Sequence, residues 1–193
     1  ISDITISAGA TTGTASFTPT DDSVYEGNET GIVAIDTVSG GSATEDGTQS
    51  VTITITENES SPTITLTSSA SSIAENAGSS LTLTVTSSII ADEDITVSIS
   101  TSGTGTEGTD YSTISDITIS AGDTTGTASF TPSDDSVYEG NETGIVAISG
   151  VSGADAAESG SQSVTITITE NESSPTVTLT TSATSIAENS GST

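Results

Sequence analysis

The sequence repeats itself after 113 residues, and this repeat limits the possible fold more than any other feature. Residues 1–80 align without a gap with residues 114–193, and 66 of these 80 positions are identical. Self-similarity at a fixed period indicates an array of similar structural units. A Ser-Ser-Pro break follows each copy of VTITITENE, and proline cannot donate a hydrogen bond within a continuing strand. We therefore predict the later part of one repeat (1–59), one complete repeat (62–172) and the beginning of another (175–193).

Apolar and polar residues alternate in seven short segments of the complete repeat, as expected for half-buried strands. No segment shows a helical period of useful length. The pattern predicts an all-β fold of tandem immunoglobulin-like antiparallel β-sandwiches with about seven strands each. The only bulky groups of the predicted core are Tyr111, Phe130 and Tyr138. The predicted strands are 63–67, 81–86, 95–100, 114–120, 126–132, 143–149 and 164–170.

Charge and composition exclude several classes of function. The chain has 27 acidic residues and no Lys, Arg or His, so its formal net charge is −27. No salt bridge can therefore form between its side chains. This charge argues against a nucleic-acid partner, because phosphate binding depends on Lys and Arg. The absence of Cys excludes disulfides and thiol chemistry. Apolar runs are too short for membrane insertion of this segment. The chain opens inside a repeat without Met or a signal peptide, so we expect it to be an internal piece of a longer protein.

Many acidic residues fall in the connections that follow the first, third and fifth predicted strands, and others come just after the seventh. If successive strands run in opposite directions, the first, third, fifth and seventh strands end at one pole, which we call the connection pole. Calcium takes six to eight oxygen ligands, whereas zinc and copper favour His or Cys, so the sequence predicts a calcium site there. Magnesium is the alternative, but it prefers to keep its waters. The candidate ligands are Glu75, Asp110, Asp134, Asp135, Glu139, Glu142, Glu170, Asn171 and Glu172, with Glu107 as a further acid nearby.

The partial repeats carry counterparts of these residues, which we also predict to bind calcium: Asp21, Asp22, Glu26, Glu29, Glu57, Asn58, Glu59 and Glu188. In each Asp-Asp pair, we expect one residue to cap a turn and the other to bind metal. The Asn residues of the ENES and GNET segments also lie in glycosylation sequons, but we favour their interpretation as residues of the calcium loops.

The opposite pole is also acidic, but its charges change between repeats. Asp123 is replaced by Ala10 and Asp155 by Ser42, whereas the acids of the connection pole recur. This internal comparison predicts ordinary solvated loops at the opposite pole, with Asp92, Glu93, Asp94 and Glu158 among them.

Four motifs, in order and at compatible spacing, resemble the Calx-β domain, the calcium-binding sandwich of sodium–calcium exchangers and of many large bacterial surface proteins. These motifs are SIAENAGSSLTLTV (72–85), GTEGTDYSTISDITISAG (105–122), FTPSDDSVYEGNET (130–143) and VTITITENE (164–172). The resemblance covers the complete repeat and both partial ones, and implies the calcium ligands named above. The family often ends this last motif with a run of Asp, where this chain has Glu-Asn-Glu.

These features predict a calcium-binding structural or adhesive module of an extracellular or cell-surface protein or filament. Calcium would make the domains and their junctions rigid, and the partners would be neighbouring repeats and cell-surface or matrix ligands. The alternative is a calcium-sensing regulatory module of a membrane protein such as an exchanger. A carbohydrate-binding module is disfavoured because aromatic residues are scarce. We do not expect an enzyme, because the same acidic cluster recurs in every repeat and no aromatic groups line a sugar cleft.

Overall fold

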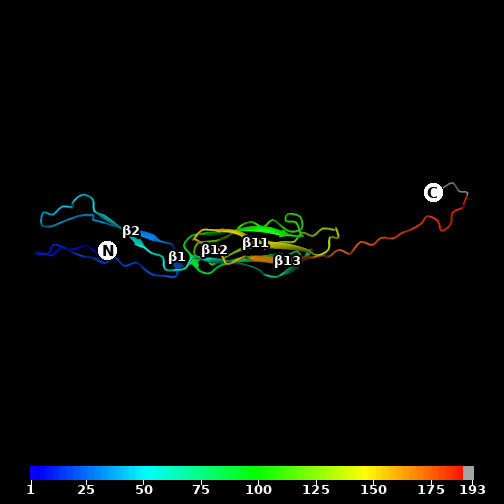
Figure 1. Cartoon of the computed structure of the whole chain (residues 1–193), viewed down its shortest axis with the longest axis horizontal. Helices are drawn as coiled ribbons and strands as arrows, with labels where there is room; N and C mark the ends of the chain where they lie inside the picture. Colours follow the sequence, from blue (N-terminus) through cyan, green and yellow to red (C-terminus); the bar gives the residue numbers. More distant parts are fainter. Residues whose placement is uncertain (189–193) are drawn as a thin grey trace.

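The computed structural model describes residues 1–188, and within them the chain forms strands, turns and loops. Figure 1 shows an elongated molecule with a β-hairpin at one end, a sandwich in the middle and the C-terminal segment extending from the other end. No helix in the described part of the chain is long and apolar enough to cross a membrane. The all-β prediction is confirmed.

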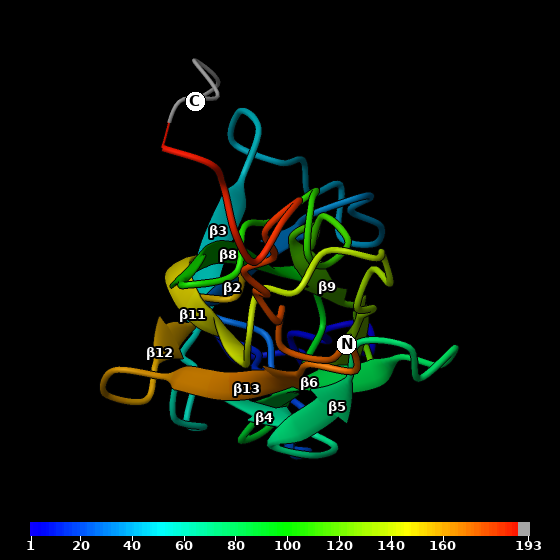
Figure 2. The same ribbon diagram turned by 90° about the vertical axis from the view of Figure 1, so that its right-hand side faces the viewer.

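Two sheets form the sandwich of the complete repeat. One sheet has the strand order β10-β6-β4-β12, and the other has the order β5-β13-β11-β8-β9. Figure 2 views the molecule along its long axis, with β4 and β8 on different sides. The strands of the first sheet are β4 (Thr63–Ser68), β6 (Leu81–Ser87), β10 (Thr125–Phe130) and β12 (Ala157–Glu158). Those of the second are β5 (Ser72–Ala74), β8 (Ile95–Gly103), β9 (Ile117–Ile119), β11 (Glu142–Ser152) and β13 (Ser163–Thr169).

Seven of these strands correspond to the seven predicted segments. The shorter β5 and β12 were not predicted, because two or three residues carry no recognisable alternation. Both are parallel additions to an edge: β5 pairs with β13, and β12 pairs with β4. The pairing of β5 is important for the site because it holds the segment just before Glu75 beside the end of β13.

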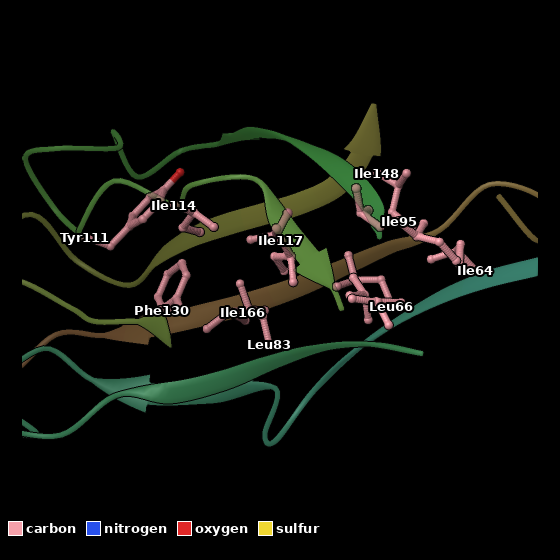
Figure 3. Packing of buried hydrophobic residues seen from close by; sticks show 14 of the residues in the cluster. Ile64, Leu66, Leu83, Ile95, Tyr111, Ile114, Ile117, Phe130, Ile148 and Ile166 are labelled. Carbon is pink, nitrogen blue, oxygen red and sulfur yellow. The ribbon is translucent and has the colours of Figure 1, made fainter. Parts of the chain in front are cut away.

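The core lies between the two sheets and consists mainly of Ile, Val and Leu (Figure 3). Its two large aromatic rings, Tyr111 and Phe130, stack with their centroids 4.6 Å apart and an interplanar angle of 20°. Gly144 in β11 lies directly against them, since a Cβ atom at this position would be 2.7 Å from the Phe130 ring. This close approach explains why a strand position facing the core carries glycine.

The N-terminal partial repeat forms only the part of the sandwich whose partner strands its sequence contains. Its strands are β1 (Val24–Tyr25), β2 (Glu29–Ala34) and β3 (Ser50–Ile55), and β2 and β3 pair in the register of β11 and β13. Residues 1–20 form no strand, because β9 and β10 in the complete repeat pair with β8 and β6, which have no counterpart in 1–59. Accordingly, Phe17 is 37 % exposed, whereas its counterpart Phe130 is 0 % exposed.

The prediction that Tyr138 belongs to the core is wrong. Its side chain is 44 % exposed, because it lies in the β10–β11 connection beyond the end of the sandwich. Its counterpart Tyr25 is only 7 % exposed and is covered by the following repeat, since β1 pairs with β7 (Ile90–Ala91). Residues 175–188 form no strand, and the remainder of the predicted third piece, 189–193, lies outside the described residues.

Candidate metal centre

The pairing of β5 with β13 brings two distant acidic segments together. Ala74 pairs with Thr169, and the Glu75 N–H donates a hydrogen bond of 3.0 Å to the Thr169 carbonyl. Glu75 and Glu170 are the next residues on these parallel segments, so both lie at the connection pole. Glu75 is 8 % exposed, which is unusual for a carboxylate with no cationic side chain in the sequence.

The Glu170 carboxylate holds the β10–β11 connection in place. One oxygen accepts hydrogen bonds from the N–H groups of Glu139 and Gly140, at 2.7 and 2.8 Å. The other oxygen accepts from the N–H groups of Asn171 and Glu172, both at 2.9 Å. A carboxylate has about four lone-pair sites, so four backbone donors occupy most of the acceptor capacity of Glu170. We therefore assign Glu170 a positioning role, and its role as a ligand stays a prediction.

Asp110 reaches the same pole through the turn between β8 and β9. Its carboxylate accepts a hydrogen bond of 2.6 Å from the Thr106 N–H, which closes the turn. Its carbonyl accepts a hydrogen bond of 3.0 Å from the Ser133 N–H, which ties the turn to the β10–β11 connection. Asp110 therefore lies next to the acids that follow Ser133.

Within the described residues, three groups of carboxylates place one oxygen from each member within 4.8 Å of the others. All three groups belong to the complete repeat, and they share Glu75 or Glu139. They are Glu75 with Glu170 and Glu172; Glu75 with Asp135 and Glu139; and Asp110 with Glu139 and Glu142. The fold thus brings seven of the predicted residues into one continuous cluster.

The surroundings of most carboxylates in the cluster disfavour their ionised form. Loss of hydration is the largest cause that raises the pKa of Glu75, Glu139 and Glu142, and nearby carboxylates raise it further. The hydrogen bond that a protonated Glu172 would donate to the Glu170 carboxylate, followed by loss of hydration, raises the pKa of Glu172 to about 7. Conversely, the N–H donors of Glu172 and Glu139 lower the pKa of Glu170 to about 2. A bound cation would favour the ionised form of every member.

The donor atoms suit a hard divalent cation. All side-chain ligands in the cluster are carboxylate oxygens, which calcium prefers. In addition, Oε2 of Glu172 is buried and has no hydrogen-bond partner. Buried polar atoms are normally satisfied, so this oxygen has the free acceptor capacity that a metal ligand needs. The residues present therefore fit calcium, which Glu75, Asp110, Asp135, Glu139, Glu142 and Glu172 would hold.

The remaining candidates of the complete repeat have other contacts. Asp135 both caps a turn, accepting a hydrogen bond of 2.6 Å from the Val137 N–H, and belongs to the cluster, so the two predicted roles fall on one residue. Asp134 adds charge near Glu75 but belongs to none of the three groups. The Asn171 side-chain amide donates to Glu172. Glu107 is satisfied by the Thr101 hydroxyl and the Ile114 N–H.

The N-terminal partial repeat forms half of the same arrangement. Glu57 accepts hydrogen bonds from four backbone N–H groups, as Glu170 does. Counterparts of Glu75 and Asp110 are missing from 1–59, so none of the three groups has an equivalent among these described residues. The predicted acids and Asn58 instead surround an open hollow of about 250 Å³: Asp21, Asp22, Glu26, Glu29, Glu57, Asn58 and Glu59. Glu188 is exposed and lies outside the strands.

Comparison with known proteins identifies the family. The sequence model of the Calx-beta domain matches residues 2–59 and 57–173, which together make up most of the chain. The chain belongs to the Calx-beta domain family. Calx-beta domains bind calcium, so calcium is the cofactor that family membership implies for this chain.

Two solved structures have a similar fold. The crystal structure of the apo-form Calx CBD1 domain is 17% identical, with a TM-score of 0.47, and the match covers 58% of this chain and 99% of that one. The crystal structure of CBD12 from CALX1.2 is 18% identical, with a TM-score of 0.45, and the match covers 51% of this chain and 40% of that one. No curated protein matches the sequence.

Proposed function

We propose that this chain is a calcium-dependent structural segment of a tandem Calx-beta array in an extracellular or cell-surface protein. The observation that supports the proposal most directly is the position of the carboxylate cluster at the junction between repeats. Glu172 is followed only by Ser173 and Ser174 before the next repeat begins at Pro175. A cation bound by this cluster would act on the fold of one repeat and on the start of the next.

Calcium would stabilise the array by relieving charge repulsion. Without a cation, each of the three groups holds three carboxylate oxygens within 4.8 Å of one another, and the sequence offers no basic side chain to neutralise them. With calcium, loops from four separate parts of the sequence would coordinate the same bound cation. The role is mechanical and does not require a reaction. Cell-surface or matrix ligands are the proposed partners of such an array.

Calorimetric titration and thermal melts test this function. Extracellular calcium modules bind with dissociation constants of roughly 10⁻⁴–10⁻³ M. At a hundredfold excess over the dissociation constant, one site adds about 2.7 kcal/mol to the free energy of unfolding. We expect Glu139→Gln and Asp110→Asn to weaken binding, and Asp123→Asn at the opposite pole to leave it unchanged. A melting midpoint that ignores calcium, or equal effects at both poles, would contradict the proposal.

The alternative is a calcium-sensing regulatory module of a membrane protein, as the family resemblance also allows. The near-identity of the repeats supports a structural role, because a regulatory pair of domains usually diverges. Affinity separates the two functions: calcium sensors bind at about 10⁻⁷–10⁻⁵ M, well below the range expected for extracellular modules. A submicromolar dissociation constant would favour regulation.

A further inference from the structure

A short segment of the β10–β11 connection and its counterpart in the first repeat differ sharply in burial. The sequence DDSVYEGNET occurs at 21–30 and at 134–143. Tyr25 is 7 % exposed in the first copy, whereas Tyr138 is 44 % exposed in the second. The local sequence is the same, so the difference must come from what lies against each tyrosine.

The complete repeat receives Tyr25 in a defined way. β1 and β7 form a short parallel pair, with Val24 opposite Ile90 and Tyr25 opposite Ala91. The Asp92 N–H donates a hydrogen bond of 3.2 Å to the Tyr25 carbonyl. Tyr25 also belongs to the same buried cluster as Ala91. The first repeat therefore docks on the second through main-chain bonds and an aromatic side chain.

The Tyr25 hydroxyl group makes two side-chain hydrogen bonds at this junction. It donates a hydrogen bond of 2.9 Å to Oδ2 of Asp155, and the Ser61 hydroxyl donates a longer bond of 3.4 Å to the Tyr25 oxygen. Asp155 lies in a turn where it and Ala154 have positive φ angles of 48° and 50°. Ala154 is itself buried, and its N–H donates to the Glu93 carboxylate. Two acids of the opposite pole therefore make specific contacts at this junction, while both Asp155 and Glu93 remain exposed, as predicted for solvated loops.

We propose that the Val137–Tyr138 segment is the docking surface for the repeat that follows in the same chain. That repeat would receive Tyr138 through its counterparts of Ile90, Ala91 and Asp155. Val137 and Tyr138 are both exposed, at 57 % and 44 %, although their counterparts form a pair with the next repeat. The connection is also the same, since Ser173, Ser174 and Pro175 repeat Ser60, Ser61 and Pro62.

The size of the contact identifies the occupant as a tethered repeat. The contact rests on two paired residues, Val24 and Tyr25, whereas a stable interface between separate proteins takes about 20–30 residues a side and buries roughly 1,200–2,000 Å². A connection of two serines replaces that area with a high effective concentration. This inference rests on the tandem array in the proposed function, but it does not require calcium.

Nitration of Tyr138 by tetranitromethane, measured by mass spectrometry, tests the inference. The full chain is compared with a chain extended after Thr193 by a second copy of residues 81–172, because 175–193 already repeat 62–80. Tyr25 and the appended counterpart of Tyr138 are changed to Phe, so that the SVYEGN peptide reports Tyr138 alone. We expect nitration of Tyr138 to fall about sixfold in the extended chain, the ratio of its 44 % exposure to the 7 % of Tyr25.

Two matched variants address the role of the acceptor. Within the unextended chain carrying Tyr138→Phe, Asp155→Ser introduces the residue found at position 42, and we expect faster nitration of Tyr25. Asp123→Ala introduces the residue found at position 10 at the same pole, and Tyr25 should stay protected. These variants need no appended repeat, so a failure of the extension to fold does not prevent the test.

Measurements in calcium and in chelator separate this inference from the proposed function. Protection of Tyr138 in either condition supports docking. Equal reactivity of Tyr138 in both chains and both conditions, or no response of Tyr25 to Asp155→Ser, would overturn the docking surface. Calorimetry would still report calcium binding in that case, so the two failures are distinguishable.

Discussion

At the scale of single residues, Glu170 and Glu172 show how two neighbouring carboxylates acquire different chemistry. Glu170 accepts four backbone N–H bonds, whereas Oε2 of Glu172 is buried without a partner. The first residue therefore fixes the shape of the loop, and the second keeps a free oxygen for a cation. Their positions in VTITITENE do not reveal this division, because it depends on N–H groups from another connection.

The first prediction concerns Glu170→Gln. The amide nitrogen of Gln cannot accept a hydrogen bond, so two of the four N–H donors lose their acceptor. We expect calcium affinity to fall about 10–100-fold, as for other residues that orient metal ligands. Calorimetric titration measures the change. Glu57→Gln is the matched control, because it removes the same arrangement from a repeat without the complete cluster. An unchanged affinity in Glu170→Gln would contradict the positioning role.

The second prediction concerns pH in the absence of calcium. The folded-state pKa of Glu172 is raised from 4.5 to about 7, so its contribution to stability is present below pH 4.5 and is lost as the pH rises through about 7. The folded-state pKa of Glu170 is lowered from 4.5 to about 2, so its contribution is present above pH 4.5 and is lost as the pH falls towards 2. We therefore expect the melting temperature in chelator to rise when the pH is lowered from 8 to about 5.

Glu172→Gln should reduce this rise, because Gln does not titrate, and should leave the part due to Glu75, Glu139 and Glu142, whose pKa values are also raised. With calcium present, the wild-type chain should release protons on binding near pH 6.5, since metal ligands must be ionised. Titrations in buffers of different ionisation enthalpy measure that release. A pH slope as steep in Glu172→Gln as in the wild-type chain would assign the titration to other residues.

At the scale of elements, the contact between β11 and the stacked rings of Tyr111 and Phe130 limits which residue fits at position 144. A Cβ atom on Gly144 would lie 2.7 Å from the Phe130 ring and 3.4 Å from the Tyr111 ring. Both rings are buried and stacked, so neither has space to move aside. The same strand position in the first repeat is Gly31, which faces the partly exposed Phe17.

The third prediction uses this pair of glycines. Gly144→Ala should destabilise the complete repeat by about 1–3 kcal/mol, the usual cost of overpacking a core. Gly31→Ala should cost much less, because the Cβ contact is 3.3 Å and Phe17 is free to shift towards solvent. Urea denaturation measures both changes. Equal losses in the two variants would show that backbone conformation, and not packing, determines the effect.

At the scale of the whole molecule, the short connections limit how the repeats move relative to each other. Ser60 and Ser61 alone separate Glu59 from Pro62, and proline restricts the residue before it. Tyr25 adds a contact across this junction, and the acids around Glu57 lie beside it. Glu26 has a raised pKa, for which loss of hydration is the main cause and the charges of Asp22 and Asp92 are further causes. The junction therefore carries charge repulsion across the repeat boundary.

The fourth prediction follows for chains with several repeats. We expect an extended rod with calcium and a more flexible chain of domains in chelator, with the same strand content in both. Small-angle scattering at fixed ionic strength measures the distance distribution, and circular dichroism checks the strand content. Superimposable scattering profiles would mean that the serine connection and the tyrosine contact make the junction rigid without calcium.

The sequence by itself determined the strands and the pole at which the acids gather. Alternation of Ile, Val and Leu with Thr and Ser is local, so the seven main strands of the complete repeat follow from it. Antiparallel connectivity then places Glu75, Asp110, Glu139 and Glu172 at one end, since every second connection must lie there. Neither inference requires knowledge of a contact between particular side chains.

Only the tertiary structure decided which groups satisfy one another. The alternation of β13 does not predict that the Glu170 carboxylate binds N–H groups of Glu139 and Gly140, because those donors come from another connection. The clearest case is the segment SVYEGN, in which Tyr25 is buried and Tyr138 is exposed. Identical local sequences reach opposite burial because burial depends on the surface that packs against them, and for Tyr25 that surface is the next repeat.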